Sequence, residues 1–162
     1  MSFYKTLGGI AGAALLGDAT TLAHARVWIR RLGGNLVSMW PMVLSARRGL
    51  RLRLPRVPGY CARARSVARI LAALPGVRVL PDPPHTNMFH VSLPVPVDAL
   101  LDASAAVARD RGLSLITYAW STDLPDACRT EITLGDAASE IDDAELAEAF
   151  AELLDRATRA AG

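Results

Sequence analysis

Apolar residues recur at helical spacing in several stretches, and these stretches predict the helices. The first such stretch begins after Asp18 and ends at Gly33-Gly34. Its apolar residues at this spacing are Leu22, Ala25 and Ile29. Asp18 is therefore expected to cap the helix at its start, and the glycine pair to end it. Similar patterns predict further helices at about residues 42–52, 59–74, 97–111 and 142–160.

Shorter apolar runs predict the strands. They span residues 77–80, 88–93, 113–119 and 129–134. Strands, a helix, strands and a second helix in this order predict an antiparallel sheet with helices on one face. We expect this small α+β domain to occupy residues 56–162, including a long linking helix, and residues 1–55 to form a separate segment.

The first seventeen residues, MSFYKTLGGIAGAALLG, have a different pattern. Ser2 to Tyr4 predicts a short strand, Leu7 to Gly9 a tight turn, and Ile10 to Leu16 a second, fully buried strand. Lys5 lies between the first strand and the turn, and it is the only lysine, since the other 17 basic residues are arginine. Unlike arginine, a lysine can lose its proton and attack a carbonyl carbon.

The opening segment has two other interpretations. A secretory signal peptide also has a basic start, an apolar core and small residues at its end. Here the core contains three glycines and only one basic residue precedes it, which disfavours a signal peptide. On composition alone, Lys5 is most simply a surface charge in an arginine-rich chain.

The motifs favour a catalytic lysine instead. Ser2-Phe3-Tyr4-Lys5 followed by Leu7-Gly8-Gly9 resembles the lysine segment of the threonine aldolase / aromatic amino acid β-eliminating lyase family, pyridoxal-phosphate enzymes of the aspartate aminotransferase fold. The resemblance covers most of the chain but only the C-terminal half of a family member. Weaker matches are Gly17-Asp18, Ala25-Arg26, Gly33-Gly34, Leu74 to Val77, Thr86-Asn87 and Arg129 to Asp136.

This resemblance implies a fold class and a set of site residues. The expected fold is α/β: part of the large domain of a pyridoxal-phosphate-dependent transferase, followed by a small α+β C-terminal domain. Lys5 would hold pyridoxal phosphate covalently, with Tyr4 and Gly8 beside the cofactor. Arg129, one residue out of register with the family pattern, would bind the substrate carboxylate.

The resemblance also implies a reaction. A complete enzyme would cleave a β-hydroxy-α-amino acid to glycine and an aldehyde. In this family the acid at the pyridine nitrogen, the stacking histidine and the phosphate loop lie upstream of the lysine, whereas here only four residues precede Lys5. The chain alone is therefore expected to be inactive. A β-eliminating amino-acid lyase and a non-catalytic α/β interaction domain with a basic face are the alternatives.

Composition narrows the class of protein further. With 162 residues and 51% hydrophobic content, the chain can bury a substantial core. Cys61 and Cys128 match no metal or redox spacing, which predicts two reduced thiols in a cytoplasmic protein. The three histidines are too scattered to predict a metal site, and no apolar run is long enough to span a membrane.

The net charge of +2 conceals a strong asymmetry. Residues 19–81 carry twelve arginines and no acid, whereas residues 82–162 carry fifteen acids and five arginines. A basic surface of this kind can bind nucleic acid, but the arginine-rich helices lack the aromatic pattern of nucleic-acid modules. We therefore expect the basic flank to be complementary to the acidic half of the chain, to a partner subunit or to a phosphate group. The expected partners are a small amino-acid substrate and, for a complete enzyme, further copies of itself.

Overall fold

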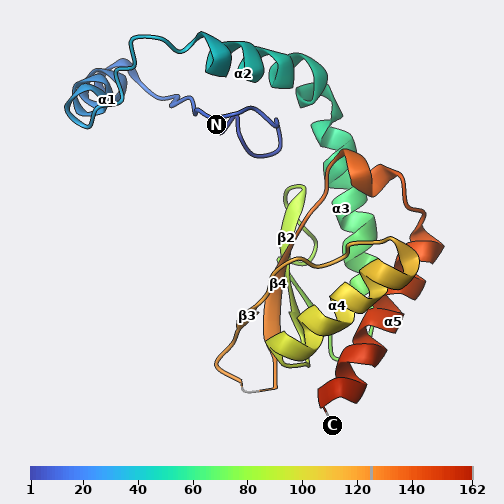
Figure 1. Ribbon diagram of the computed structural model, residues 1–162. Helices are drawn as coiled ribbons and strands as arrows, with labels where there is room; N and C mark the ends of the chain where they lie inside the picture. Colours follow the sequence, from blue (N-terminus) through green and yellow to red (C-terminus); the bar gives the residue numbers. More distant parts are fainter. Residues whose placement is uncertain (125, 162) are drawn as a thin grey trace. The chain divides into compact units, whose positions relative to one another are not determined.

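In the part of the chain that the structure describes, helices between residues 57 and 161 pack beside one antiparallel sheet (Figure 1). The computed structural model describes residues 1–124 and 126–161. The α-helices are α1 (Ala19–Arg31), α2 (Trp40–Leu52), α3 (Val57–Ala72), α4 (Val97–Arg111) and α5 (Asp143–Ala161). The strands are β1 (Arg78–Leu80), β2 (Met88–Leu93), β3 (Trp120–Ser121) and β4 (Cys128–Thr133), and η1 (Leu54–Arg56) and η2 (Asp136–Ser139) are short 3₁₀ helices.

The sheet has the strand order β1-β2-β4-β3, and every neighbouring pair is antiparallel. Its centre is the pairing of β2 with β4, in which Phe89 lies opposite Ile132 and His90 opposite Glu131. Because side chains alternate along a strand, this register gives each strand one buried and one more open face. Phe89, Val91 and Leu93 of β2 are buried, as are Cys128, Thr130 and Ile132 of β4.

Helices α3, α4 and α5 cover the buried face of the sheet (Figure 1). Each contributes apolar residues at helical spacing to one core, as their sequence pattern predicted. Val67 and Leu71 come from α3, Leu100 and Val107 from α4, and Phe150 and Leu153 from α5. The opposite face of the sheet, which we call the open face, carries His90, Ser92, Arg129 and Glu131.

The predicted strand at residues 113–119 is wrong. Only Trp120 and Ser121 pair with β4, while the preceding residues run as irregular chain. Their backbone is held by side chains: the Ser104 hydroxyl donates to the Ile116 carbonyl at 2.6 Å, and the Thr130 hydroxyl donates to the Tyr118 carbonyl at 2.7 Å. These bonds satisfy polar groups that a strand ladder would otherwise satisfy.

The buried strand predicted at Ile10 to Leu16 is also wrong. Ile10, Leu15 and Leu16 are 70%, 59% and 73% exposed. The pairing with the first predicted strand is reduced to one antiparallel bridge, between Ser2 and Ala13. An apolar run becomes a buried strand only where a neighbouring strand pairs with it. The described residues of this segment have no other strand beside them.

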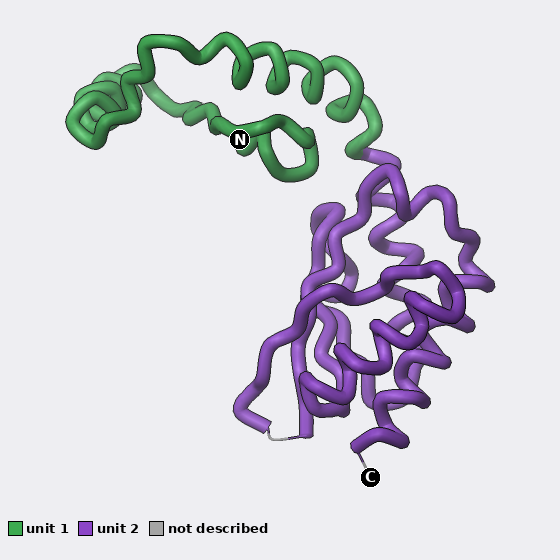
Figure 2. The backbone as a smooth tube through the Cα atoms, viewed as in Figure 1, with its two compact units in different colours: residues 1–57 green, residues 58–162 purple. Residues whose placement is uncertain are grey.

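The chain divides into two compact units, Met1–Val57 and Pro58–Gly162 (Figure 2). Residues 1–57 carry nine basic residues and one acid, a formal charge of +8, and residues 58–162 carry nine arginines and fifteen acids, a formal charge of −6. The sheet and the apolar core belong to the second unit. In the first unit, Leu7 is the only buried large apolar side chain among the described residues.

Candidate functional site

The lysine segment forms a closed loop at the start of the first unit. The Phe3 N–H donates to the Gly12 carbonyl at 3.0 Å, and the Ala14 N–H donates to the Met1 carbonyl at 2.8 Å. Within the loop, the Gly8 N–H donates to the Lys5 carbonyl at 2.8 Å. Lys5 therefore lies in a turn rather than at the end of a regular strand.

Helix α2 holds this loop in place. The Ile10 N–H donates to the Ser45 hydroxyl at 3.0 Å. Leu7 is buried against the helix at Gly49, where an added Cβ would lie only 2.4 Å from the Leu7 carbonyl oxygen. Gly8 has a φ of 64°, and a Cβ there would meet the Arg53 guanidinium. The close approach of the loop to α2 thus requires a glycine at position 49, and the positive φ favours one at position 8.

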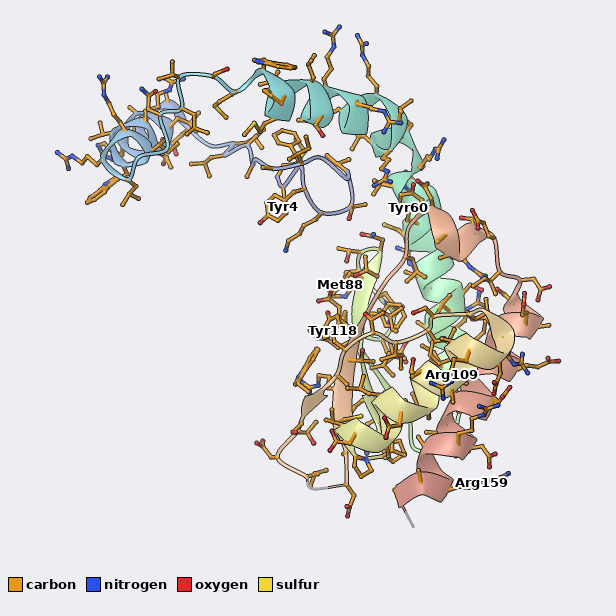
Figure 3. The ribbon with its side chains drawn as sticks, in the orientation of Figure 1. Tyr4, Tyr60, Met88, Arg109, Tyr118 and Arg159 are labelled. Carbon is orange, nitrogen blue, oxygen red and sulfur yellow. The ribbon has the colours of Figure 1, made fainter. Side chains whose placement is uncertain are left out.

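The three predicted cofactor-binding residues share the outer surface of this loop. Lys5 and Gly8 are exposed. Tyr4, which is labelled in Figure 3, is 55% exposed. The structure therefore brings Lys5, Tyr4 and Gly8 together on one turn, with the lysine accessible.

Arg129, the predicted carboxylate ligand, lies in β4 of the second unit. It pairs with Ser92 on one side and Trp120 on the other. Its neighbours Cys128 and Thr130 point into the core, so Arg129 lies on the open face. Its Nε atom is buried and has no hydrogen-bond partner among the described residues. An unpaired buried guanidinium nitrogen is costly, and an anion could satisfy it.

Arg129 belongs to a polar and aromatic cluster that the sequence analysis missed. The His90 and Trp120 rings are 5.5 Å apart and nearly perpendicular, and the Trp120 and Tyr118 rings are stacked at 5.9 Å. The His90 Nε2 atom lies 3.8 Å from a Glu131 carboxylate oxygen. His90 and Ser92 alternate with buried residues along β2, and this alternation could have predicted from the sequence that both lie on the open face. That Trp120 and Glu131 lie beside them follows only from the strand order.

The described residues contain no cluster of three or more possible metal ligands, and no helix among them is long and apolar enough to cross a membrane. Cys61 and Cys128 are both free thiols, as the sequence predicted.

Comparison with known proteins identifies the family from structure. No protein-family model and no curated protein sequence matches the chain. Among solved structures, a candidate aromatic amino acid β-eliminating lyase/threonine aldolase from Exiguobacterium sp. 255-15 is 39% identical, with a TM-score of 0.83 over 96% of this chain. A candidate L-allo-threonine aldolase from Listeria monocytogenes EGD-E is 33% identical, with a TM-score of 0.84 over 96% of this chain. The chain is thus related to the threonine aldolase / aromatic amino acid β-eliminating lyase family.

The match covers only part of these relatives. The chain spans 43% of the length of each and corresponds to their C-terminal half. A methionine gamma lyase from Micromonospora echinospora, CalE6, has the same fold at 23% identity, with a TM-score of 0.57 over 95% of this chain. The predicted α/β fold class, part of a pyridoxal-phosphate-dependent lyase fold, is confirmed.

The residues present fit part of a pyridoxal-phosphate site. An accessible primary amine on an exposed turn suits an aldehyde-bearing ring, because the amine can reach the aldehyde carbon. The buried, unpaired Nε of Arg129 suits a carboxylate. These roles remain predictions for Lys5, Tyr4, Gly8 and Arg129.

Proposed function

We propose that this chain forms the C-terminal part of a pyridoxal-phosphate-dependent amino-acid lyase that cleaves β-hydroxy-α-amino acids to glycine and an aldehyde. The observation that carries the proposal is the accessible Lys5 loop within a chain related to threonine aldolases. The bound cofactor would supply an electron-withdrawing ring next to the bond that breaks.

Each residue of the chain has a limited task in this proposal. Lys5 holds the cofactor through its amine, which attacks a carbonyl only when it is unprotonated. Tyr4 and Gly8 would border the cofactor on the same turn, and α2 fixes that turn through Ser45 and Gly49. Arg129 binds and orients the substrate carboxylate, since its guanidinium presents donors in a planar fork.

The single lysine makes the cofactor proposal directly testable. The chain is mixed with pyridoxal phosphate, treated with borohydride to make any attachment permanent, digested and analysed by mass spectrometry. The amine at Met1 is the other candidate, but it donates a hydrogen bond to the Ala14 carbonyl at 2.7 Å. We expect label on Lys5 and its loss in Lys5→Arg, which keeps the positive charge. Label only at Met1, or none, would contradict the proposal.

The second candidate function is a non-catalytic module with a basic face, which one observation favours. Arg47, Arg48 and Arg51 of α2 are exposed and line a shallow hollow of about 370 Å³ together with Leu44 and Leu52. If this face is an interface with a protein partner, binding to generic duplex DNA should be weak and disappear at moderate salt. Tight, salt-resistant and sequence-selective binding in a gel-shift assay would favour a nucleic-acid module instead.

A further inference from the structure

A cavity lies in the second unit, and its lining residues are distant in sequence from the lysine loop. Its volume is about 450 Å³, within the range of small-molecule sites. It lies between the irregular segment 114–118 and the end of β4, with walls from α3 and α5. It exists because residues 113–119 do not pair with β4, so the edge of the sheet is not closed there.

The floor of this cavity is apolar. Val67, Ile132, Leu146 and Phe150 line it, and all of them are among the buried residues of the core. A ligand that reaches the floor must therefore carry an apolar body of limited size, because burying an unpaired polar group there costs free energy.

The mouth of the cavity is polar and carries one charge. Tyr118, Glu131 and Thr133 line it, and Glu131 is the only charged residue of the lining. The Thr133 hydroxyl donates to a Glu131 carboxylate oxygen at 3.2 Å. The pKa of Tyr118 is raised above its usual 10.0, mainly by partial burial of the hydroxyl and secondly by the neighbouring Glu131 carboxylate. The Tyr118 hydroxyl therefore stays protonated at neutral pH.

We infer that this cavity binds a small amphipathic amine, with its apolar body on the floor and its ammonium group against Glu131. Glu131 is the only charged residue of the lining, so its carboxylate attracts a cation and repels an anion. An ammonium group there would compete with the His90 ring, whose Nε2 atom lies 3.8 Å from the carboxylate. The formal charge of −6 on residues 58–162 acts in the same direction. The cavity uses neither Lys5 nor Arg129, although its Tyr118 and Glu131 belong to the cluster that contains Arg129, and its test does not depend on the proposed lyase function.

Isothermal titration calorimetry of the full chain with 2-phenylethylamine tests the ligand class, and 3-phenylpropionate serves as the anionic analogue of similar size. We expect the amine to bind with a dissociation constant of roughly millimolar or tighter, and at least about ten times more tightly than the carboxylate. Absence of binding by the amine, or equal binding of the two compounds, would overturn the inference.

Two pairs of variants test the location. Glu131→Gln should weaken amine binding about tenfold and remove the preference over the carboxylate, whereas Glu145→Gln on the exposed side of α5 should change neither. Ala137→Phe, at an exposed residue of the lining, should block the cavity, and Ala151→Phe, exposed outside the lining, should not. Circular dichroism verifies that each variant is folded. Unchanged amine binding in Ala137→Phe would place the ligand elsewhere.

Discussion

Cys61 and Cys128 have different surroundings although neither forms a disulfide. Cys61 is partly exposed on α3, whereas Cys128 is fully buried in β4. Burial raises the pKa of the Cys128 thiol to about 11, so very little of it is in the reactive thiolate form at neutral pH.

We therefore predict that one thiol per folded chain reacts rapidly with a disulfide reagent at pH 8, and that the second reacts only after denaturation. Cys61→Ser should remove the rapid reaction, while Cys128→Ser should leave it unchanged. Colorimetric thiol counting gives both rates. Rapid reaction of Cys128 in the folded protein would show that β4 opens readily.

Asp143, at the start of α5, is fixed by two side chains of α3. It accepts a hydrogen bond from the Ser66 hydroxyl at 2.7 Å and pairs with the Arg63 guanidinium. Arg63 also donates to the Ala138 and Ile141 carbonyls at 3.0 and 2.6 Å. The bond from Ser66, followed by that from Arg63, lowers the pKa of Asp143 below its usual 3.8.

This lowered pKa predicts a dependence of stability on pH. Because folding favours the ionised carboxyl, its stabilising effect is present above about pH 3.8 and is lost as the pH falls through the folded pKa. Asp143→Asn should lower the melting temperature at pH 7, and the difference from wild type should narrow below pH 3.8. Asp102→Asn, at an exposed site on α4, is the control, and a difference independent of pH would contradict the assignment.

At the scale of elements, the Ser104 hydroxyl forms hydrogen bonds that hold residues 113–119 in an irregular conformation rather than in a strand. Ser104 is buried on α4, donates to the Ile116 carbonyl at 2.6 Å and accepts from the Ile116 N–H at 3.3 Å. A buried backbone group satisfied in this way has no need of a neighbouring strand. The same arrangement leaves the cavity beside β4 open.

Ser104→Ala should destabilise the second unit by about 1–3 kcal/mol, because the two Ile116 backbone groups lose their buried partner. Ser121→Ala, at an exposed site on β3, should cost less than about 0.5 kcal/mol. Urea unfolding followed by circular dichroism measures both. An equal effect of the two variants would mean that the Ser104 bonds do not hold the segment.

At the scale of the whole molecule, the two units differ in how much they bury. The described part of residues 58–162 contains a continuous core around the sheet, whereas helix α1 has no buried residue. Trp28, Val37 and Trp40 of the first unit are 58%, 104% and 66% exposed. An exposed apolar surface of this kind is typical of sites that bind another protein, a membrane or a ligand.

The chain by itself is predicted not to be a competent lyase. One amine and one guanidinium do not supply the acid at the ring nitrogen, the stacking residue or the phosphate loop that the family resemblance implies. Purified chain with pyridoxal phosphate should release no measurable glycine from threonine, and Lys5→Ala should remove what cofactor attachment there is. Robust cleavage that is lost in Lys5→Ala would contradict this prediction while supporting the role of Lys5.

The sequence by itself determined the helices and the central strands. Asp18 accepts from the Thr21 N–H at the start of α1, as its position before the apolar pattern predicted. The α2, α3, α4 and α5 helices and the β2–β4 pair also lie near their predicted positions, and the family resemblance is confirmed. Periodicity and capping are local, so a single sequence contains enough information for them.

Only the tertiary structure decided that Ile10 to Leu16 and residues 113–119 are not strands. Both have strand-like composition, but a strand also needs a neighbour with free backbone groups, and that neighbour comes from elsewhere in the chain. The same is true of the cluster of His90, Trp120 and Glu131 and of the cavity with Glu131 at its mouth. Contacts between residues distant in sequence depend on the strand order β1-β2-β4-β3, which no local pattern specifies.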